Sequence, residues 1–119
     1  MLILAHKNLE VYKISLHLVK EVYLITKSFP KEELYVLVSQ LRRADISVCS
    51  NIAEGSARSS KLERKRFYEI SRSSLVEIET QIEISILLGY TEPKKTIELE
   101  KSMESIFKML SKLITNLSA

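Results

Sequence analysis

The chain has few of the residues that build loops, metal sites and disulfides. Its 119 residues include two Gly, two Pro, two His and one Cys. Because Cys49 is alone, no internal disulfide can form, and no Cys/His cluster has the spacing of a metal site. The scarcity of Gly and Pro argues against a flexible linker, a disordered tail or a turn-rich sandwich. The composition therefore favours helices, and the length favours one domain over residues 1–119.

Long uncharged apolar runs are also missing. No stretch approaches the roughly 20 residues that a membrane-spanning helix needs. The apolar segment at residues 1–5 has no basic segment before it and is followed by His6 and Lys7, so it does not resemble a signal peptide. We therefore expect a cytoplasmic protein with no membrane contact, and a reducing compartment also fits the single Cys49.

The motifs of common enzymes do not occur. With glycine only at positions 55 and 89, no glycine-rich nucleotide loop is possible, and there is no nucleophile elbow or helical zinc motif. His6 and His17 have no carboxylate or thiol at ligand spacing, and the Glu-x-x-His pair of di-metal bundles is absent. We expect a non-enzymatic protein with no catalytic residue, no cofactor and no metal ion.

Two helices are expected in the first half of the chain. The first begins after Asn8, which can cap its first turn, and ends near Phe29 and Pro30. The second begins around Pro30 and Lys31, and Gly55 is expected to stop it. Its core row is Leu34, Leu37, Val38, Leu41, Val48 and Ile52.

Two more helices are expected in the second half. The third begins with a capping box formed by Ser60 and Glu63 and runs to Gly89. Its inward row is Phe67, Ile70, Ser74, Ile78, Gln81 or Ile82, and Ser85. The fourth can be capped by Thr91, with Pro93 in its first turn. It carries a bundle-type seam of Leu99, Met103, Ile106, Leu110, Leu113 and Leu117.

Short connections near residues 28–31, 55–60 and 89–92 join these helices. Short links force consecutive helices to lie antiparallel. The predicted fold is therefore all-α, an antiparallel up-down-up-down four-helix bundle.

The first helix carries more apolar surface than one core-facing stripe requires. Its two apolar rows have centres roughly 140° apart, whereas a single stripe needs little more than about 100°. The surplus indicates either a central position in the bundle or a contact with another subunit. We assign the hypothetical oligomer interface to one of these rows: Val11, Ile14, Leu18, Val22 and Ile25.

Charge is polarised along the chain although the formal net charge is only +3. Residues 58–72 hold six basic and two acidic side chains, whereas residues 73–104 hold three basic and seven acidic ones. The basic group could neutralise phosphates without sequence preference, and the alternative is an ordinary solvated helix face. The hypothetical nucleic-acid-binding residues are Arg42, Arg43, Arg58, Lys61, Arg64, Lys65, Arg66 and Arg72.

Asp45 is the most unexpected residue because it falls inside the core row of the second helix. A buried carboxylate without a partner costs several kcal/mol, so we expect Asp45 to be paired or to lie at the edge of the core. Arg42, one turn earlier, is the possible partner. Cys49, one turn later, is expected to pack as a small hydrophobe.

The chain also resembles a known family. The matching runs are residues 29–35, 39–44 and 50–55, which include Ser50-Asn51-Ile52-Ala53-Glu54-Gly55, and residues 77–81 of the third helix. These resemble the four-helix-bundle proteins encoded in 23S ribosomal RNA intervening sequences. That family is similar to the accessory variability determinant proteins of diversity-generating retroelements, which form pentamers and associate with nucleic acid and a reverse transcriptase. The departures are Asp45, Cys49 and Val36, where relatives commonly have a small residue, Pro and Gly.

The resemblance implies a homopentamer whose partners are RNA or DNA and a reverse transcriptase or another protein. It also implies that Arg43, Asn51, Glu54 and Glu77 occupy the family's recurrent polar positions, which we interpret as a structural network between helices. The leading hypothesis is an oligomer that contacts nucleic acid through a repeated basic patch, and RNA is the nucleic acid that we expect. The alternative is a protein-interaction scaffold that does not bind nucleic acid directly.

Overall fold

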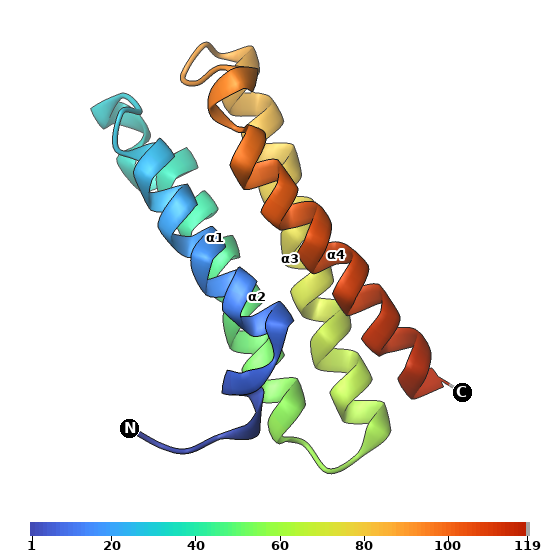
Figure 1. Cartoon of the computed structure of the whole chain (residues 1–119). Coiled ribbons are helices and arrows are strands. Elements are labelled where there is room, and N and C mark those ends of the chain that lie inside the picture. Colours follow the sequence, from blue (N-terminus) through green and yellow to red (C-terminus); the bar gives the residue numbers. More distant parts are fainter. Residues whose placement is uncertain (119) are drawn as a thin grey trace.

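The computed structural model describes residues 1–118 and consists of four long α-helices with short helical turns between them (Figure 1). The α-helices are α1 (Glu10–Thr26), α2 (Ser39–Ala57), α3 (Lys61–Leu87) and α4 (Ile97–Ser118). Short 3₁₀ turns cover Ala5–Asn8, Lys31–Glu33 and Pro93–Lys95, and a π-helical turn covers Leu34–Val38. The described residues contain no strand, so the all-α, four-helix prediction is confirmed.

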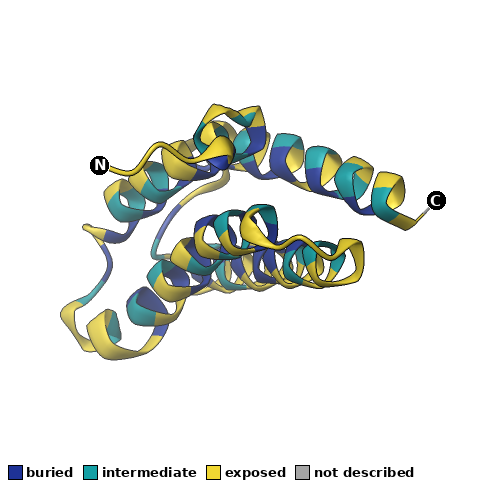
Figure 2. Ribbon diagram, turned by 90° about the horizontal axis from the view of Figure 1, so that it is seen from below, coloured by how far each residue is buried: buried dark blue, intermediate teal, exposed yellow. Residues whose placement is uncertain are grey.

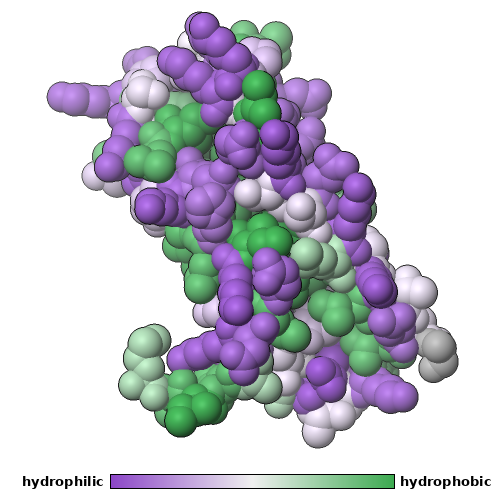
Figure 3. All heavy atoms as spheres, in the orientation of Figure 1, coloured by the Kyte–Doolittle hydropathy of each residue, from purple (hydrophilic) through white to green (hydrophobic). Residues whose placement is uncertain are grey.

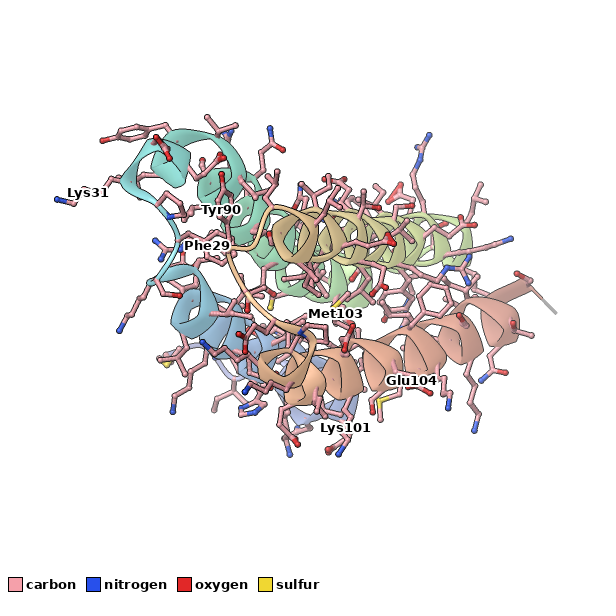
Figure 4. All side chains as sticks on the ribbon, turned by 90° about the horizontal axis from the view of Figure 1, so that it is seen from above. Phe29, Lys31, Tyr90, Lys101, Met103 and Glu104 are labelled. Carbon is pink, nitrogen blue, oxygen red and sulfur yellow. The ribbon has the colours of Figure 1, made fainter. Side chains whose placement is uncertain are left out.

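The four helices lie in two layers, with α1 and α4 in one and α2 and α3 in the other (Figures 2 and 4). Hydrogen bonds between α2 and α3 fall in opposite order along the two helices. The Ser56 hydroxyl lies 2.8 Å from that of Tyr68, and the Ser47 hydroxyl lies 2.9 Å from that of Ser74. Buried residues lie mainly on the sides of the helices that face the other layer (Figure 2). The core therefore lies between the layers.

The predicted core rows are correct over most of their length. The seam of α4 is buried at Leu99, Met103, Ile106 and Leu110, but it then continues through Ile114 rather than through Leu113. On the second helix Leu34 is 44% exposed, which corrects its assignment to the core. Leu34 begins the π-helical turn, whose extra residue changes the direction in which side chains point.

On α3 the inward row is shifted from its predicted position near the start of the helix. Ile70 is 43% exposed, whereas Tyr68, Ser71 and Leu75 are buried. Ser71 faces α2 because its hydroxyl donates to the carbonyl of Val48 at 2.8 Å. Serine is small enough to let α2 and α3 approach closely, and the apolar pattern alone did not reveal this.

The predicted oligomer interface on α1 needs correction. Val11, Leu18 and Val22 are buried within their own chain, and Ile14 and Ile25 pack against the same core. The first helix contacts both α2 and α4, so its wide apolar face is used inside the subunit. The apolar side chains of α1 that remain uncovered are Leu16 and Leu24, which are 48% and 58% exposed.

Helix ends confirm some predicted signals and correct others. The Ser60 hydroxyl accepts from the Glu63 amide at 3.3 Å, as the capping box predicts. Gly89 has φ +77° just after α3, in the left-handed region that favours glycine. Thr91 caps no helix. Its hydroxyl is buried without a hydrogen-bond partner among the described residues, and α4 begins only after Thr96.

Gly55 does not stop the second helix, which continues to Ala57. A Cβ atom at position 55 would lie 2.9 Å from Cε1 of Tyr68 and 3.1 Å from Cβ of Phe67. The glycine therefore allows α2 and α3 to approach closely, and the helix ends where Arg58 adopts extended backbone angles.

No helix within residues 1–118 combines the length and the apolar character that crossing a membrane requires.

The packing around Gly55 predicts that Gly55→Ala destabilises the fold, although alanine is the better helix former. The added methyl group collides with the Tyr68 ring, and overpacking of this kind costs about 1–3 kcal/mol. Urea unfolding monitored by circular dichroism measures the change. Ser50→Ala, at an exposed position of the same helix, is the matched control and should be neutral or slightly stabilising. A Gly55→Ala variant as stable as the control would contradict the close-approach role.

Candidate nucleic-acid interface

The fold concentrates positive charge in one half of the bundle. The basic half, residues 1–19, 46–72 and 105–118, contains both ends of the chain and the link between α2 and α3 (Figure 1). It holds ten Lys and Arg against four Glu, a formal charge of +6. The acidic half, residues 20–45 and 73–104, holds eight Lys and Arg against eleven Asp and Glu, a formal charge of −3. The polarity of the sequence thus becomes a polarity of the folded molecule.

Of the six basic residues at positions 58–72, only Arg58 forms an ion pair among the described residues, and three of the other five also make no hydrogen bond and reach the solvent. Lys61 and Arg66 are exposed on α3, and Lys65 is partly exposed. None of the three is held by another side chain, so each can reach toward a phosphate group. They are the strongest candidates for nucleic-acid contact.

Two other members of the group, Arg58 in the link before α3 and Arg72 on α3, are engaged within the chain. Arg58 pairs with Glu54 at 3.2 Å and lies 4.9 Å above the Phe67 ring. The Arg72 guanidinium donates to the Ser111 hydroxyl at 3.1 Å and lies 5.7 Å from the centre of the Phe107 ring. Arg64 is half-buried, and its Nε has no hydrogen-bond partner among the described residues. Arg58 and Arg72 supply positive charge while they also hold α3 against its neighbours.

The sequence interpretation missed four lysines of the basic half, Lys7 and Lys13 before and within α1 and Lys108 and Lys112 on α4. Lys108 and Lys112 lie on α4, whose last turns pack beside the start of α3, as the Arg72–Ser111 bond records. Lys112 is exposed, and Lys108 forms an exposed pair with Glu104 at 3.2 Å. An antiparallel arrangement of α3 and α4 places Lys108 and Lys112 near Arg72, but the charge pattern within α3 does not include residues of its neighbour.

Arg42 and Arg43 lie apart from the basic half. The Arg42 Nε donates to the Thr26 hydroxyl at 3.1 Å, and its guanidinium lies 4.3 Å from the centre of the Tyr23 ring. Arg43 lines a groove between α2 and α3. The structure therefore does not bring these two arginines together with the six basic residues at positions 58–72.

The predicted polar network forms only in part. The Asn51 amide donates to the Ser47 carbonyl at 2.8 Å and to the Ser47 hydroxyl at 3.0 Å, and that hydroxyl bonds Ser74 of α3. Glu54 instead pairs with Arg58, and Arg43 and Glu77 line the same groove of about 290 Å³ without a direct bond. The bridge between the helices is thus made by serines, whose role the sequence pattern did not reveal.

Asp45 is fully buried, which corrects the expectation of a partner or an edge position. Its exposure is 0%, and neither carboxyl oxygen has a hydrogen-bond partner among the described residues. Arg42 is not that partner because it bonds Thr26. Burial, with a smaller contribution from the charge of Glu21, raises the pKa of Asp45 from 3.8 to about 7. Nearby Cys49 is buried as expected, and burial also raises the pKa of its thiol.

A groove of about 590 Å³ lies between α3 and α4. Its apolar lining is Leu75, Val76, Met103 and Phe107, and its charged lining is Glu79, Glu100, Glu104 and Lys108. Met103 points from α4 toward α3, whereas Lys101 points away from the groove (Figure 4). Three carboxylates against one ammonium make this groove unfavourable for phosphates.

Comparison with known proteins identifies a family. The family model described as 23S rRNA-intervening sequence protein matches residues 7–112, a range that contains α1, α2, α3 and most of α4. The resemblance to this family is confirmed, whereas the similarity to accessory variability determinant proteins stays a prediction. A search of curated proteins gives no match.

The burial of Asp45 predicts a stability that falls as pH rises. In the folded chain the pKa is about 7, whereas in the unfolded chain it returns to 3.8, so the unfolded state loses its proton first. The stability is complete below about pH 4 and is lost as pH approaches about 7, a change on the order of 4 kcal/mol. Asp45→Asn removes the titration. The free energy of unfolding of this variant, relative to that of the native chain, should therefore increase as pH rises from about 4 to about 7.

Urea unfolding at several pH values measures this difference. Glu69→Gln, at an exposed position of α3, is the matched control and should keep the pH dependence of the native chain. If the difference between Asp45→Asn and the native chain were the same at every pH, the carboxyl would not be titrating as described.

Proposed function

Because the chain belongs to the 23S rRNA-intervening sequence protein family, we propose that it is a non-enzymatic cytoplasmic protein that associates with RNA as a homo-oligomer. Each subunit is an antiparallel up-down-up-down bundle that contributes its basic half to the binding surface. The formal charge of +6 on that half is the observation that carries the proposal. Lys61, Lys65 and Arg66 make the leading phosphate contacts.

The basic half suits contact with a phosphate backbone rather than the reading of bases. Lysine and arginine side chains that displace condensed counterions give affinity without sequence preference, and that affinity falls steeply with salt. One subunit offers only a few such contacts. An oligomer repeats the surface, and several weak contacts to one strand then act together through effective concentration. A pentamer is the assembly that we propose, with DNA as the other nucleic acid that this chemistry would accept.

A second candidate function is a protein-interaction scaffold. The observation that favours it is the apolar groove between α3 and α4, whose three carboxylates suit a basic partner better than a nucleic acid. A reverse transcriptase or another basic protein would fit this description. The three carboxylates of the groove lie in the acidic half, whereas the leading phosphate contacts lie in the basic half, so charge reversal at each of these sets separates the two functions.

Reversing Lys61, Lys65 and Arg66 to Glu should weaken RNA binding and flatten its salt dependence. Each lost phosphate contact lowers the slope of log affinity against log salt by about 1. Filter binding of a single-stranded RNA at several salt concentrations measures both quantities. The matched control reverses Lys31, Lys94 and Lys95, three exposed lysines of the acidic half, and should bind more like the native protein. Equal losses in both triple variants would mean that only net charge matters, which would contradict a basic binding surface.

Light scattering should give a mass five times the 13.7 kDa of one chain in the absence of RNA. The oligomer should persist on dilution to protein concentrations below those at which RNA binds, because the proposed binding requires several subunits to contact one strand. A mass of one chain throughout would contradict the oligomer, whatever the RNA result.

A further inference from the structure

Part of the surplus apolar surface that the sequence indicates on the first helix remains uncovered in the folded chain. Val11 and Leu18 belong to the apolar row that is buried in the core. Tyr12, Leu16 and Val19 belong to the other row, and Leu16 is 48% exposed. Figure 3 shows the face on which α1 and α4 lie, where hydrophobic side chains reach the surface between hydrophilic ones. The row that stays uncovered is therefore not the predicted oligomer interface.

The uncovered row of α1 lies beside α2 and forms an apolar strip with it. Tyr23, four residues after Val19 on the same row, faces α2 because the Arg42 guanidinium lies 4.3 Å from the centre of its ring. Ile46 and Ala53, four and eleven residues after Arg42, lie on the same side of α2 as Arg42 does. The apolar strip consists of Tyr12, Leu16, Val19, Ile46 and Ala53, each of them exposed or partly exposed.

Positive charge lies around the apolar strip rather than along its middle. Lys13 and Lys20 follow its outer edge on α1, and Arg42 and Arg43 lie at its end on α2, one turn before Ile46. The two glutamates of α1 do not offset this charge, because they line pockets between α1 and α4. The strip therefore suits an apolar surface whose edges are acidic.

The second half of α3 carries a surface of this kind. The α3 row consists of Ser73, Val76, Thr80, Ile84 and Leu87, all of them exposed. At about 100° per residue these five positions fall within about 80° of one another, and Glu77 and Glu83 lie about 60° to either side of their centre. No Lys or Arg occurs between residues 73 and 87. The α3 row is thus uncharged in its middle and acidic at both edges.

The apolar strip and the α3 row lie on different sides of the bundle. The first helix contacts α2 and α4, and α3 contacts the same two helices, so α1 and α3 stand at opposite corners. The α3 row is centred about 180° from the buried Ile78 and Ile82, so it points away from the core. Two neighbouring copies can therefore contact one subunit at the same time. The leading phosphate contacts, at positions 61–66, precede the α3 row along the helix.

We infer that the α3 row of one copy of the chain packs on the apolar strip of a second copy. This rests on the homo-oligomer of the proposed function and adds its interface. Val76, Ile84 and Leu87 contact the strip, while Glu77 and Glu83 face the lysines and arginines around it. Each subunit gives one surface and receives the other, and such contacts close into a ring when the rotation between subunits allows it. A five-membered ring requires unlike surfaces, because contacts between like surfaces join subunits only in pairs.

One arginine placed in each surface tests this interface. Leu16→Arg puts a cation into the apolar strip, and Ile84→Arg puts one into the α3 row. Each substitution should weaken self-association by about tenfold or more, because the guanidinium loses its water against apolar side chains. Mixed in equal amounts, the two variants should form a pair with twice the mass of one chain, since the intact α3 row of the first fits the intact strip of the second. Light scattering over a dilution series measures the mass.

Ile97→Arg is the matched control, because Ile97 is as exposed as Leu16 and lies outside both surfaces. It should keep the native mass, and thermal unfolding checks that every variant remains folded. The inference is overturned if Leu16→Arg or Ile84→Arg keeps the native mass, or if their mixture never exceeds the mass of one chain. In those outcomes a native oligomer that retains RNA leaves the proposed function standing. A native chain that is monomeric at every concentration removes both.

Discussion

The close contact between α2 and α3 is the constraint on which the rest of the molecule depends. At one end Gly55 leaves room for the Tyr68 ring, and along the contact Ser71 donates to the carbonyl of Val48 at 2.8 Å. Side chains this small allow the two helix backbones to approach, and the Ser47–Ser74 bond then satisfies polar groups that the approach buries. The position of α3 largely fixes the place of the positive charge, because six of the ten Lys and Arg residues of the basic half lie between positions 58 and 72.

Charge and packing are distributed differently in the bundle. The core is continuous across both layers, but the formal charge changes from +6 in the basic half to −3 in the acidic half. Arg72 connects the two properties because its guanidinium bonds Ser111 and covers Phe107 while it adds to the positive charge. A substitution at Arg72 would therefore alter packing as well as charge, whereas Lys61 and Arg66 carry charge alone.

Much of the fold could be predicted from the sequence because its signals are local. The Ser60 capping box and the row of Leu99, Met103 and Ile106 depend on residues within one helix. What could not be predicted depends on contacts between helices. Gly55 looks like a helix stop until the Tyr68 ring is beside it, and Arg42 looks like the partner of Asp45 until it is seen to bond Thr26 instead. For the candidate site, the basic residues of α3 were readable, whereas Lys108 and Lys112 required the position of α4.

The separation of charge gives the subunit a permanent electric dipole along the length of the bundle. In the field of a polyanion such a body experiences a torque as well as an attraction, so it arrives with its positive half first. The groove between α3 and α4 lies partly beyond the neutral middle of the bundle, toward the negative half. In a subunit oriented in this way, the carboxylates of the groove lie farther from the polyanion than the lysines and arginines of the basic half do.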